Sequence, residues 1–287
     1  MKQKHFMSNT LLGAAAAVVM GICTNIAIAD EPCGDLEECR AFIEINASDG
    51  DIGFHALLDA EGWERARIID PDGKKIFEER ARGALKDQKL TENFFESAEP
   101  LCEEELVEEG EDDEVVTLPE FLERFPAGPY EFRTRGKGGG DEVSVGITMF
   151  THLIPAAPAD VDFDGSEISW KYGDDLGECT TFPEGFMLAD ELDIVGYEVV
   201  LEPDDDALGS FKFTVQVPSD VVETSYSVTV PLEYLASLPG DTPLKVEVGA
   251  IERRVDVMML ESFGNTTFTE EDGFCNNADQ EMCPEEE

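Results

Sequence analysis

The sequence predicts a mostly β protein with two β-sandwich domains in tandem, and three observations support this class. Short segments in both halves alternate apolar and polar residues, which puts one apolar row on a buried sheet face. Clusters of Gly, Pro, Asn and Asp separate these segments and are typical of turns between strands. In the middle of the chain, Pro155-Ala-Ala-Pro158 is typical of a stiff, extended connector between two domains.

Residues 1–29 have the pattern of a secretory signal peptide. A basic start at Lys2 leads into an apolar run from Leu11 to Cys23, and Ala27-Ile28-Ala29 matches a cleavage site. An uncleaved anchor is the alternative, but the run is short for a bilayer span, which needs about 20 residues. We therefore predict a secreted protein, periplasmic or extracellular, that starts at Asp30 and has no stable membrane insertion.

The composition is strongly acidic, with 65 acidic against 20 basic residues and a formal net charge of −45 at pH 7. Such a surface repels nucleic acid and anionic membranes, and excludes both as ordinary partners. Adaptation to a salty environment explains the charge better than a dedicated cation-binding role, because salt screens self-repulsion. The partner we expect is an unknown protein or an extracellular polymer.

The predicted N-terminal domain, residues 30–154, is an immunoglobulin-like sandwich with one short helix. Alternating segments run from Arg40 to Ile76, whereas residues 80–98 are ambiguous apart from a strand at Phe94-Phe95. The other expected elements are a turn at Asp70-Pro-Asp-Gly73, a helix with a capping box of Thr117 and Glu120, and a hairpin of residues 130–133 and 143–149 across a Gly-rich turn.

An acidic loop, residues 99–116, interrupts this domain. It contains too little apolar surface to offset the entropy lost on ordering, so we expect a mobile loop whose start Cys102 can fix in place. A Pro-rich linker, residues 155–161, then leads to the C-terminal domain, residues 162–270. An acidic tail with two cysteines, residues 271–287, ends the chain.

The C-terminal domain contains six or seven short alternating strands, the number expected of a sandwich. Three of its segments resemble the fibronectin type III family. These segments are Ile168-Ser-Trp170, Ile194 to Val199, and Leu238-Pro-Gly240 leading to an alternating strand of Leu244, Val246, Val248 and Ala250. The resemblance covers about residues 156–270.

This resemblance implies that Trp170 and Tyr197 are buried core residues on the second and third strands of the domain. Leu244 departs from the family pattern, because a Tyr whose hydroxyl bonds to the upstream turn usually stands there. The stretch from Arg253 to Leu260 also lengthens the loop that follows this strand. No Arg-Gly-Asp cell-binding tripeptide is present.

Six cysteines remain after the signal peptide, and an even count in an exported protein favours disulfides. They are Cys33, Cys39, Cys102, Cys179, Cys275 and Cys283. The close pairs Cys33 with Cys39 and Cys275 with Cys283 can form local loops. In that case Cys102 and Cys179 either bridge the two domains or stay free. In the rival pairing, Cys179 bonds to Cys275 or Cys283.

A candidate cation loop begins at Asp160, where Asp162, Asp164 and Gly165 complete the opening spacing of a calcium loop. Lys171 occupies the position of the final acidic ligand, so a plain acidic linker is the alternative. Calcium at this loop is the one cofactor considered. A second, weaker cluster contains Asn46, Ser48, Asp49 and Asp51.

Catalytic motifs are scarce in the predicted mature chain. His55 and His152 are its two histidines, and there is no Gly-x-Ser-x-Gly elbow. His55 lies opposite Phe54 in the strand alternation, so we expect it to be exposed or partly packed. The favoured function is that of a non-catalytic, exported binding or envelope protein. The alternative is a secreted hydrolase or cation-dependent enzyme with its site in the N-terminal domain, which a pocket of converging acids with shifted pKa values would favour.

Overall fold

The computed structural model describes residues 33–108, 113–136, 143–190, 193–204, 208, 211–219, 225–255, 261–276 and 283. The predicted signal peptide lies outside these residues, as do the centre of the acidic loop, most of the Gly-rich turn and the second half of the 253–260 loop. The protein is mostly β, as predicted, and the described strands form three sheets of seven, four and three strands. Within the described chain, none of the helices has the length and apolar character needed to cross a membrane.

The N-terminal sandwich packs three strands of the seven-stranded sheet against the four-stranded sheet. Its core contains fully buried Trp63, Tyr130, Phe132 and Phe150, which lie on the apolar rows that alternation predicts. The elements are β1 (Glu38–Asn46), β2 (Asp51–Trp63), β3 (Arg65–Ile69), β4 (Lys75–Arg80), α1 (Ala84–Gln88), β5 (Leu90–Glu96), η1 (Glu104–Leu106), α2 (Leu118–Arg124), β6 (Gly128–Arg135) and β7 (Val143–Phe150).

Two predicted elements of this half are confirmed, and one helix is added. The capping box of Thr117 and Glu120 starts α2, and β6 and β7 form the expected antiparallel hairpin. The N-terminal half has a second short α-helix, α1, in the stretch that the sequence left ambiguous. Its residues are not buried, so no apolar face marked it in advance.

The C-terminal sandwich packs the three-stranded sheet β12-β9-β8 against the other four strands of the seven-stranded sheet. Trp170 is 1% exposed and contacts Tyr197 and Tyr226, with ring centroids 5.4 and 5.9 Å away, so its predicted core position is confirmed. The elements are β8 (Ala159–Phe163), β9 (Glu167–Lys171), β10 (Ile194–Pro203), β11 (Phe213–Pro218), β12 (Ser225–Thr229), α3 (Leu232–Leu235), β13 (Pro243–Val255) and β14 (Glu261–Cys275).

The atypical position Leu244 is fully buried in this core together with Val246 and Val248. A different tyrosine, Tyr234, hydrogen-bonds to the backbone through its hydroxyl. The Tyr234 hydroxyl donates to the carbonyl oxygens of Leu201 and Phe211, at 2.9 and 2.6 Å. Tyr234 thereby connects α3 to the backbone of β10.

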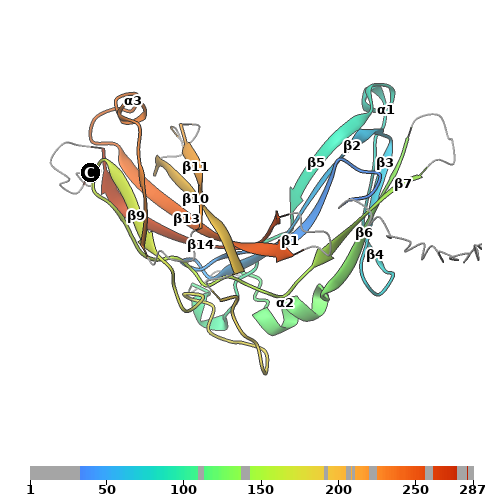
Figure 1. The fold of residues 1–287 in the computed structure, drawn as a ribbon, viewed down its shortest axis with the longest axis horizontal. Coiled ribbons are helices and arrows are strands. Elements are labelled where there is room, and N and C mark those ends of the chain that lie inside the picture. The colour runs from blue at the N-terminus through green and yellow to red at the C-terminus, as the bar shows by residue number, and fades with distance from the viewer. Residues whose placement is uncertain are drawn as a thin grey trace, which may run out of the picture.

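The two sandwiches share the seven-stranded sheet, whose order is β11-β10-β13-β14-β1-β2-β5. The connection is the parallel pairing of β1 with β14, in which Glu44 lies opposite Thr266 and Asn46 opposite Phe268. Asn265 is 2% exposed at this junction; it accepts from the Ile43 amide at 2.8 Å and donates to the Leu153 carbonyl at 2.6 Å. The sheet is bent into a wide V, with the smaller sheets on its outer sides (Figure 1).

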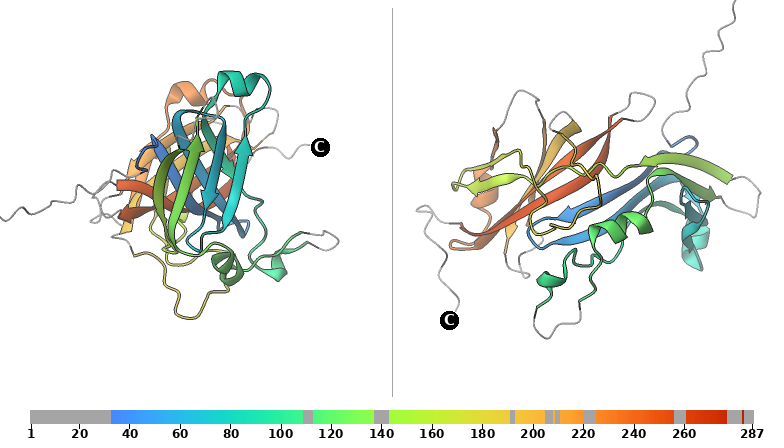
Figure 2. Two further views of the ribbon diagram at one scale, coloured as in Figure 1. Left: turned by 90° about the vertical axis from the view of Figure 1, so that its right-hand side faces the viewer. Right: turned by 90° about the horizontal axis from the view of Figure 1, so that it is seen from below.

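Views along the other axes show the same arrangement. The four-stranded sheet forms the outer layer of the N-terminal half, and β13 and β14 run beside β1 and β2 without a break (Figure 2). The hydrophobic cores therefore lie on the outer side of the V, one under each arm. None of the described elements forms a layer on the remaining face of the seven-stranded sheet.

The acidic segment is more ordered than we expected from its composition. Leu101 forms β-bridges with Asp51 and Val115, and Val116 is fully buried. Glu103 accepts from the Thr180 amide at 2.7 Å, and a disulfide bonds Cys102 to Cys179. These contacts offset the entropy cost that the low apolar content alone would leave.

The disulfides follow one of the two pairings left open by the sequence. Cys33 bonds to Cys39, Cys102 to Cys179, and Cys275 to Cys283. The rival pairing of Cys179 with the tail is excluded. The long loop that contains Cys179 packs into the N-terminal core through Leu176 and Cys179, which explains why Cys102 is within reach.

Candidate functional site

The free face of the seven-stranded sheet is the surface that lines the inside of the V (Figure 1). In β13, for example, Leu244, Val246 and Val248 enter the core, so Lys245 and Glu247 lie on the opposite, free face. Residues opposite each other in neighbouring strands share a face, and the strand register therefore extends this row across the whole sheet.

The free face is predominantly acidic, because the outward rows of six strands carry carboxylates. They are Glu92 and Glu96 of β5, Asp51 and Asp59 of β2, Glu38 and Glu44 of β1, Glu270 of β14, Glu247 of β13, and Glu198 and Glu202 of β10. Among the side chains that the structure describes, Arg40 and Lys245 are the basic residues on the same rows, and Lys212, just before β11, pairs with Glu202.

Lys245 is engaged by three of these carboxylates. Its Nζ lies 2.9 Å from Glu270, 3.2 Å from Glu247 and 3.5 Å from Glu202. Lys212 Nζ also lies 2.5 Å from Glu202, so two positive charges face three negative charges and this part of the face keeps a net negative charge.

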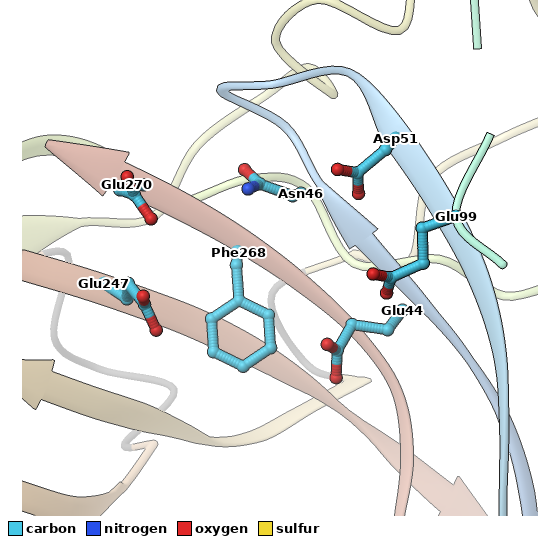
Figure 3. Close-up of a pocket in the computed structure, with 7 residues that line it drawn as sticks. All are labelled: Glu44, Asn46, Asp51, Glu99, Glu247, Phe268 and Glu270. Atoms are coloured by element: carbon cyan, nitrogen blue, oxygen red, sulfur yellow. The ribbon is translucent and has the colours of Figure 1, made fainter. Parts of the chain in front are cut away.

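A pocket of about 190 Å³ opens on the free face where β1, β2, β13 and β14 meet. Its lining residues are Glu44, Asn46, Asp51, Glu99, Glu247, Phe268 and Glu270 (Figure 3). The Phe268 ring lies between two groups of acids: Glu44, Asp51 and Glu99 on one side, and Glu247 and Glu270 on the other (Figure 3). Gly249 makes this arrangement possible, because a Cβ at that position would overlap the Phe268 ring.

Two acids of the pocket have strongly raised pKa values. Burial, together with the nearby carboxylates of Glu99, Glu198 and Glu96, raises the pKa of Glu44 to about 8. Burial and the carboxylate of Glu99 likewise raise the pKa of Asp51 to about 7. Both groups therefore exchange protons near neutral pH, unlike an ordinary surface carboxylate.

His55 adds a nitrogen to this group of carboxylates. It projects from β2 onto the free face, opposite Phe54 as predicted, but it is 2% exposed rather than exposed or partly packed. Phe42 and Phe94 cover it, with ring centroids 5.2 and 5.8 Å away. Its Nε2 lies 3.4 Å from Glu99 Oε1 and 3.9 Å from Glu44 Oε1.

Burial lowers the pKa of His55, and the neighbouring Glu99 opposes this effect only in part. The imidazole is therefore neutral at neutral pH. Its Nδ1 is buried and has no hydrogen-bond partner.

The structure does not gather the carboxylates of the predicted cation loop. Asp160 accepts from Lys171 Nζ at 2.6 Å, and Asp164 Oδ1 accepts from the Ser166 and Glu167 amides at 2.9 and 2.8 Å, as in an ordinary turn. In the part of the chain that the structure describes, the cluster able to hold a metal is instead Glu44, His55 and Glu99. A calcium loop that includes Asp162 stays a prediction.

The second predicted cluster, Asn46, Ser48, Asp49 and Asp51, mainly forms the turn between β1 and β2. Asn46 Oδ1 accepts from the Ser48 and Asp49 amides at 3.1 and 3.3 Å, and Asn46 Nδ2 donates to Asp49 at 2.7 Å. Asp51, the last member, lines the pocket. His152 lies apart, with Nε2 2.8 Å from the Phe125 carbonyl oxygen.

Comparisons with known proteins give no family. No family model and no curated protein matches the chain. A solved structure titled "Biofilm associated protein - BSP domain" is similar at 14% identity and a TM-score of 0.21, over 83% of this chain and 29% of that chain. A two-domain fibronectin type III segment from chicken tenascin is similar at 10% identity and a TM-score of 0.23, over 83% of this chain and 98% of that chain.

This chain thus spans less than a third of the length of the first of these structures. At such low identities and TM-scores, neither likeness supports a function for it. The fibronectin type III resemblance of the C-terminal half rests on its own residues and strands.

Proposed function

We propose that this chain is an exported, non-catalytic binding protein whose free sheet face binds a lysine- and arginine-rich segment of a partner protein. The observation that supports this proposal is the convergence of acidic rows from strands of both sandwiches on one concave face (Figure 1). Charge complementarity selects a cationic partner and speeds its association. The three disulfides are in keeping with an oxidising compartment outside the cytosol.

Aromatic residues on the same face suit such a partner. Phe94, which is 53% exposed, lies on one arm, and Phe268 lies in the central pocket. Arginine and lysine side chains bind aromatic faces through cation–π interactions as well as carboxylates. A basic segment lying along the face would therefore have both kinds of contact.

The test is calorimetric titration of the mature protein with a decalysine peptide in EDTA, with an uncharged peptide of the same length as reference. The double variant Glu96→Gln/Glu198→Gln removes one free-face charge from each arm. The matched control Asp72→Asn/Glu123→Gln removes two exposed charges elsewhere. We expect at least tenfold weaker binding for the free-face variant and less than twofold for the control. Equal losses would show that only the total charge matters and would contradict the proposal.

One observation favours a second candidate, a secreted hydrolase. Glu44, with a pKa of about 8, is protonated at neutral pH beside other carboxylates, which is the arrangement of a general acid. A panel of nitrophenyl glycosides and phosphate esters tests this candidate. Turnover that Glu44→Gln abolishes would establish it, and no turnover across the panel would favour the binding protein.

A further inference from the structure

We propose that Glu44, His55 and Glu99 bind one divalent transition-metal ion, with zinc as the best match, on the free face of the seven-stranded sheet. The site is independent of the peptide-binding function proposed above, because it depends on three specific donors rather than on the charge of the whole face.

The donor atoms are already close to the spacing that zinc requires. One nitrogen and two carboxylate oxygens lie within 4.8 Å of one another. Zinc bonds of about 2.0–2.2 Å at tetrahedral angles place two ligand atoms roughly 3.3–3.6 Å apart. The 3.4 Å between His55 Nε2 and Glu99 Oε1 meets this spacing, and the 3.9 Å to Glu44 Oε1 needs only a small side-chain rotation.

The burial of His55 is the observation that separates this cluster from an ordinary patch of surface acids. The side chain is 2% exposed, and its Nε2 is the atom directed at the two carboxylates. A neutral imidazole binds a metal ion through Nε2 when its proton is on Nδ1. A nitrogen donor favours zinc and similar ions over calcium and magnesium, which prefer all-oxygen sites.

Gly53 provides the space in which these donors meet. It lies between His55 and Glu99 on the free face, and a Cβ at this position would be 2.9 Å from both His55 Nε2 and Glu99 Oε1. Such a contact is closer than van der Waals packing allows, so any larger residue would push the donors apart. The absence of a side chain at Gly53 therefore keeps the space between His55 and Glu99 open.

The electrostatic surroundings also favour a cation. Glu44 lies near the carboxylates of Glu99, Glu198, Glu96 and Asp51. A divalent ion held between Glu44 and Glu99 would neutralise part of the repulsion among these carboxylates. The ammonium group of Lys245, which lies beside the pocket, is already paired with Glu247 and Glu270.

The first experiment is calorimetric titration of the EDTA-treated mature protein with zinc chloride, manganese chloride and calcium chloride. Sodium chloride at 0.5 M suppresses diffuse binding to the acidic surface. We expect one zinc per chain, bound at least tenfold more tightly than calcium. His55→Gln and Glu44→Gln should each weaken zinc binding at least tenfold, whereas the control Glu123→Gln, which removes an exposed charge elsewhere, should change it less than twofold.

The variant Gly53→Ala tests the geometry with every donor retained. It should also weaken zinc binding at least tenfold while leaving the melting temperature in EDTA unchanged, because the flexible end of Glu99 can move aside. This variant keeps the proposal testable if a substitution of buried His55 prevents folding.

Nitrogen-15 spectra of the imidazole rings give a direct readout in the unmodified protein. The predicted mature chain has two histidines, so one equivalent of zinc should shift the Nε2 signal of His55 and leave His152 unchanged. Many weak equivalent sites, equal affinity for calcium, or unchanged binding in His55→Gln would each overturn the proposal. Peptide binding measured in EDTA would persist in that case, so the two proposals can fail separately.

Discussion

Removing the disulfide between Cys102 and Cys179 should destabilise the protein more than removing either local disulfide. A cross-link stabilises mainly by restricting the unfolded chain, and its effect grows with the length of the closed loop. For the 77-residue separation of Cys102 and Cys179, the chain-entropy relation gives about 4.5 kcal/mol. For the 8-residue separation of Cys275 and Cys283 it gives about 2.5 kcal/mol.

The folded state should survive this change, so the difference reports on the unfolded chain. Glu103 would still accept hydrogen bonds from the Thr180 and Thr181 amides, and these hold the two segments together beside the missing bond. The buried position of both cysteines, each 1% exposed, makes alanine a better replacement than serine, because a serine hydroxyl would lack a partner.

The assay is urea unfolding of Cys102→Ala/Cys179→Ala and Cys275→Ala/Cys283→Ala, with the unmodified protein as reference. For a chain of this size, the larger loss corresponds to a fall in melting temperature of roughly 9–18 °C. The difference of about 2 kcal/mol between the two variants is the decisive quantity. If the long-range variant loses no more stability than the local one, the chain-entropy reasoning is wrong for this protein.

Four further predictions follow from named residues and charges. Trp170→Ala should cost about 3–5 kcal/mol, because it empties a fully buried aromatic site; an unchanged melting temperature would contradict this. Raising sodium chloride to about 1 M should raise the melting temperature, since screening relieves the self-repulsion of the acidic surface, and a flat or falling curve would refute it. Burial alone would raise the pKa of Glu103, but hydrogen bonds from Thr181 and Thr180 outweigh burial, so the pKa lies below its ordinary value of 4.5. The ionised Glu103 therefore stabilises the fold at pH values above 4.5, and this contribution is lost as the pH falls below 4.5. Glu103→Gln should therefore lose less stability than the unmodified protein between pH 5 and pH 3, measured by urea unfolding, and equal losses would count against this role. N-terminal sequencing of the exported protein should begin at Asp30, and a start at Met1 would disprove cleavage.

The buried rows of the fold could be predicted because they depend on local alternation. Tyr197, Val246 and Val248 enter the core as a period of two requires, and Trp170 lies on the strand where the fibronectin type III resemblance places it. The start of α2 was equally local, since the capping residues are three positions apart.

The sharing of one sheet by both sandwiches could not be predicted in this way. It depends on the pairing of β1 with β14, whose partners Glu44 and Thr266 are far apart in the sequence. An edge strand carries no local mark of which other edge it will pair with, because backbone hydrogen bonds are the same for every sequence. The boundaries proposed between the two domains therefore stay a prediction, while the structure adds the sheet that connects the two cores.

The candidate site was missed for a related reason. With 65 acidic residues, no local pattern distinguishes the carboxylates that converge from those that do not. A usable signal was nevertheless present: the alternation that assigns Phe54 to the core assigns His55 to the opposite face. The same rule assigns Glu44 and Asp51 to that face. What the alternation cannot show is the strand order that places Glu99 over Gly53 and buries the histidine.

The position of these acids also indicates how the protein tolerates them. A row of like charges on a sheet is destabilising, and the neighbouring carboxylates add to burial in raising the pKa of Glu44. Both cores lie on the other side of the sheet, so the charges do not interrupt apolar packing. The repulsion between carboxylates is therefore confined to the free face. Any cation bound there, whether a peptide side chain or a metal ion, would reduce this repulsion. Binding and folding are consequently linked, and a ligand of this face should stabilise the protein according to its concentration and affinity.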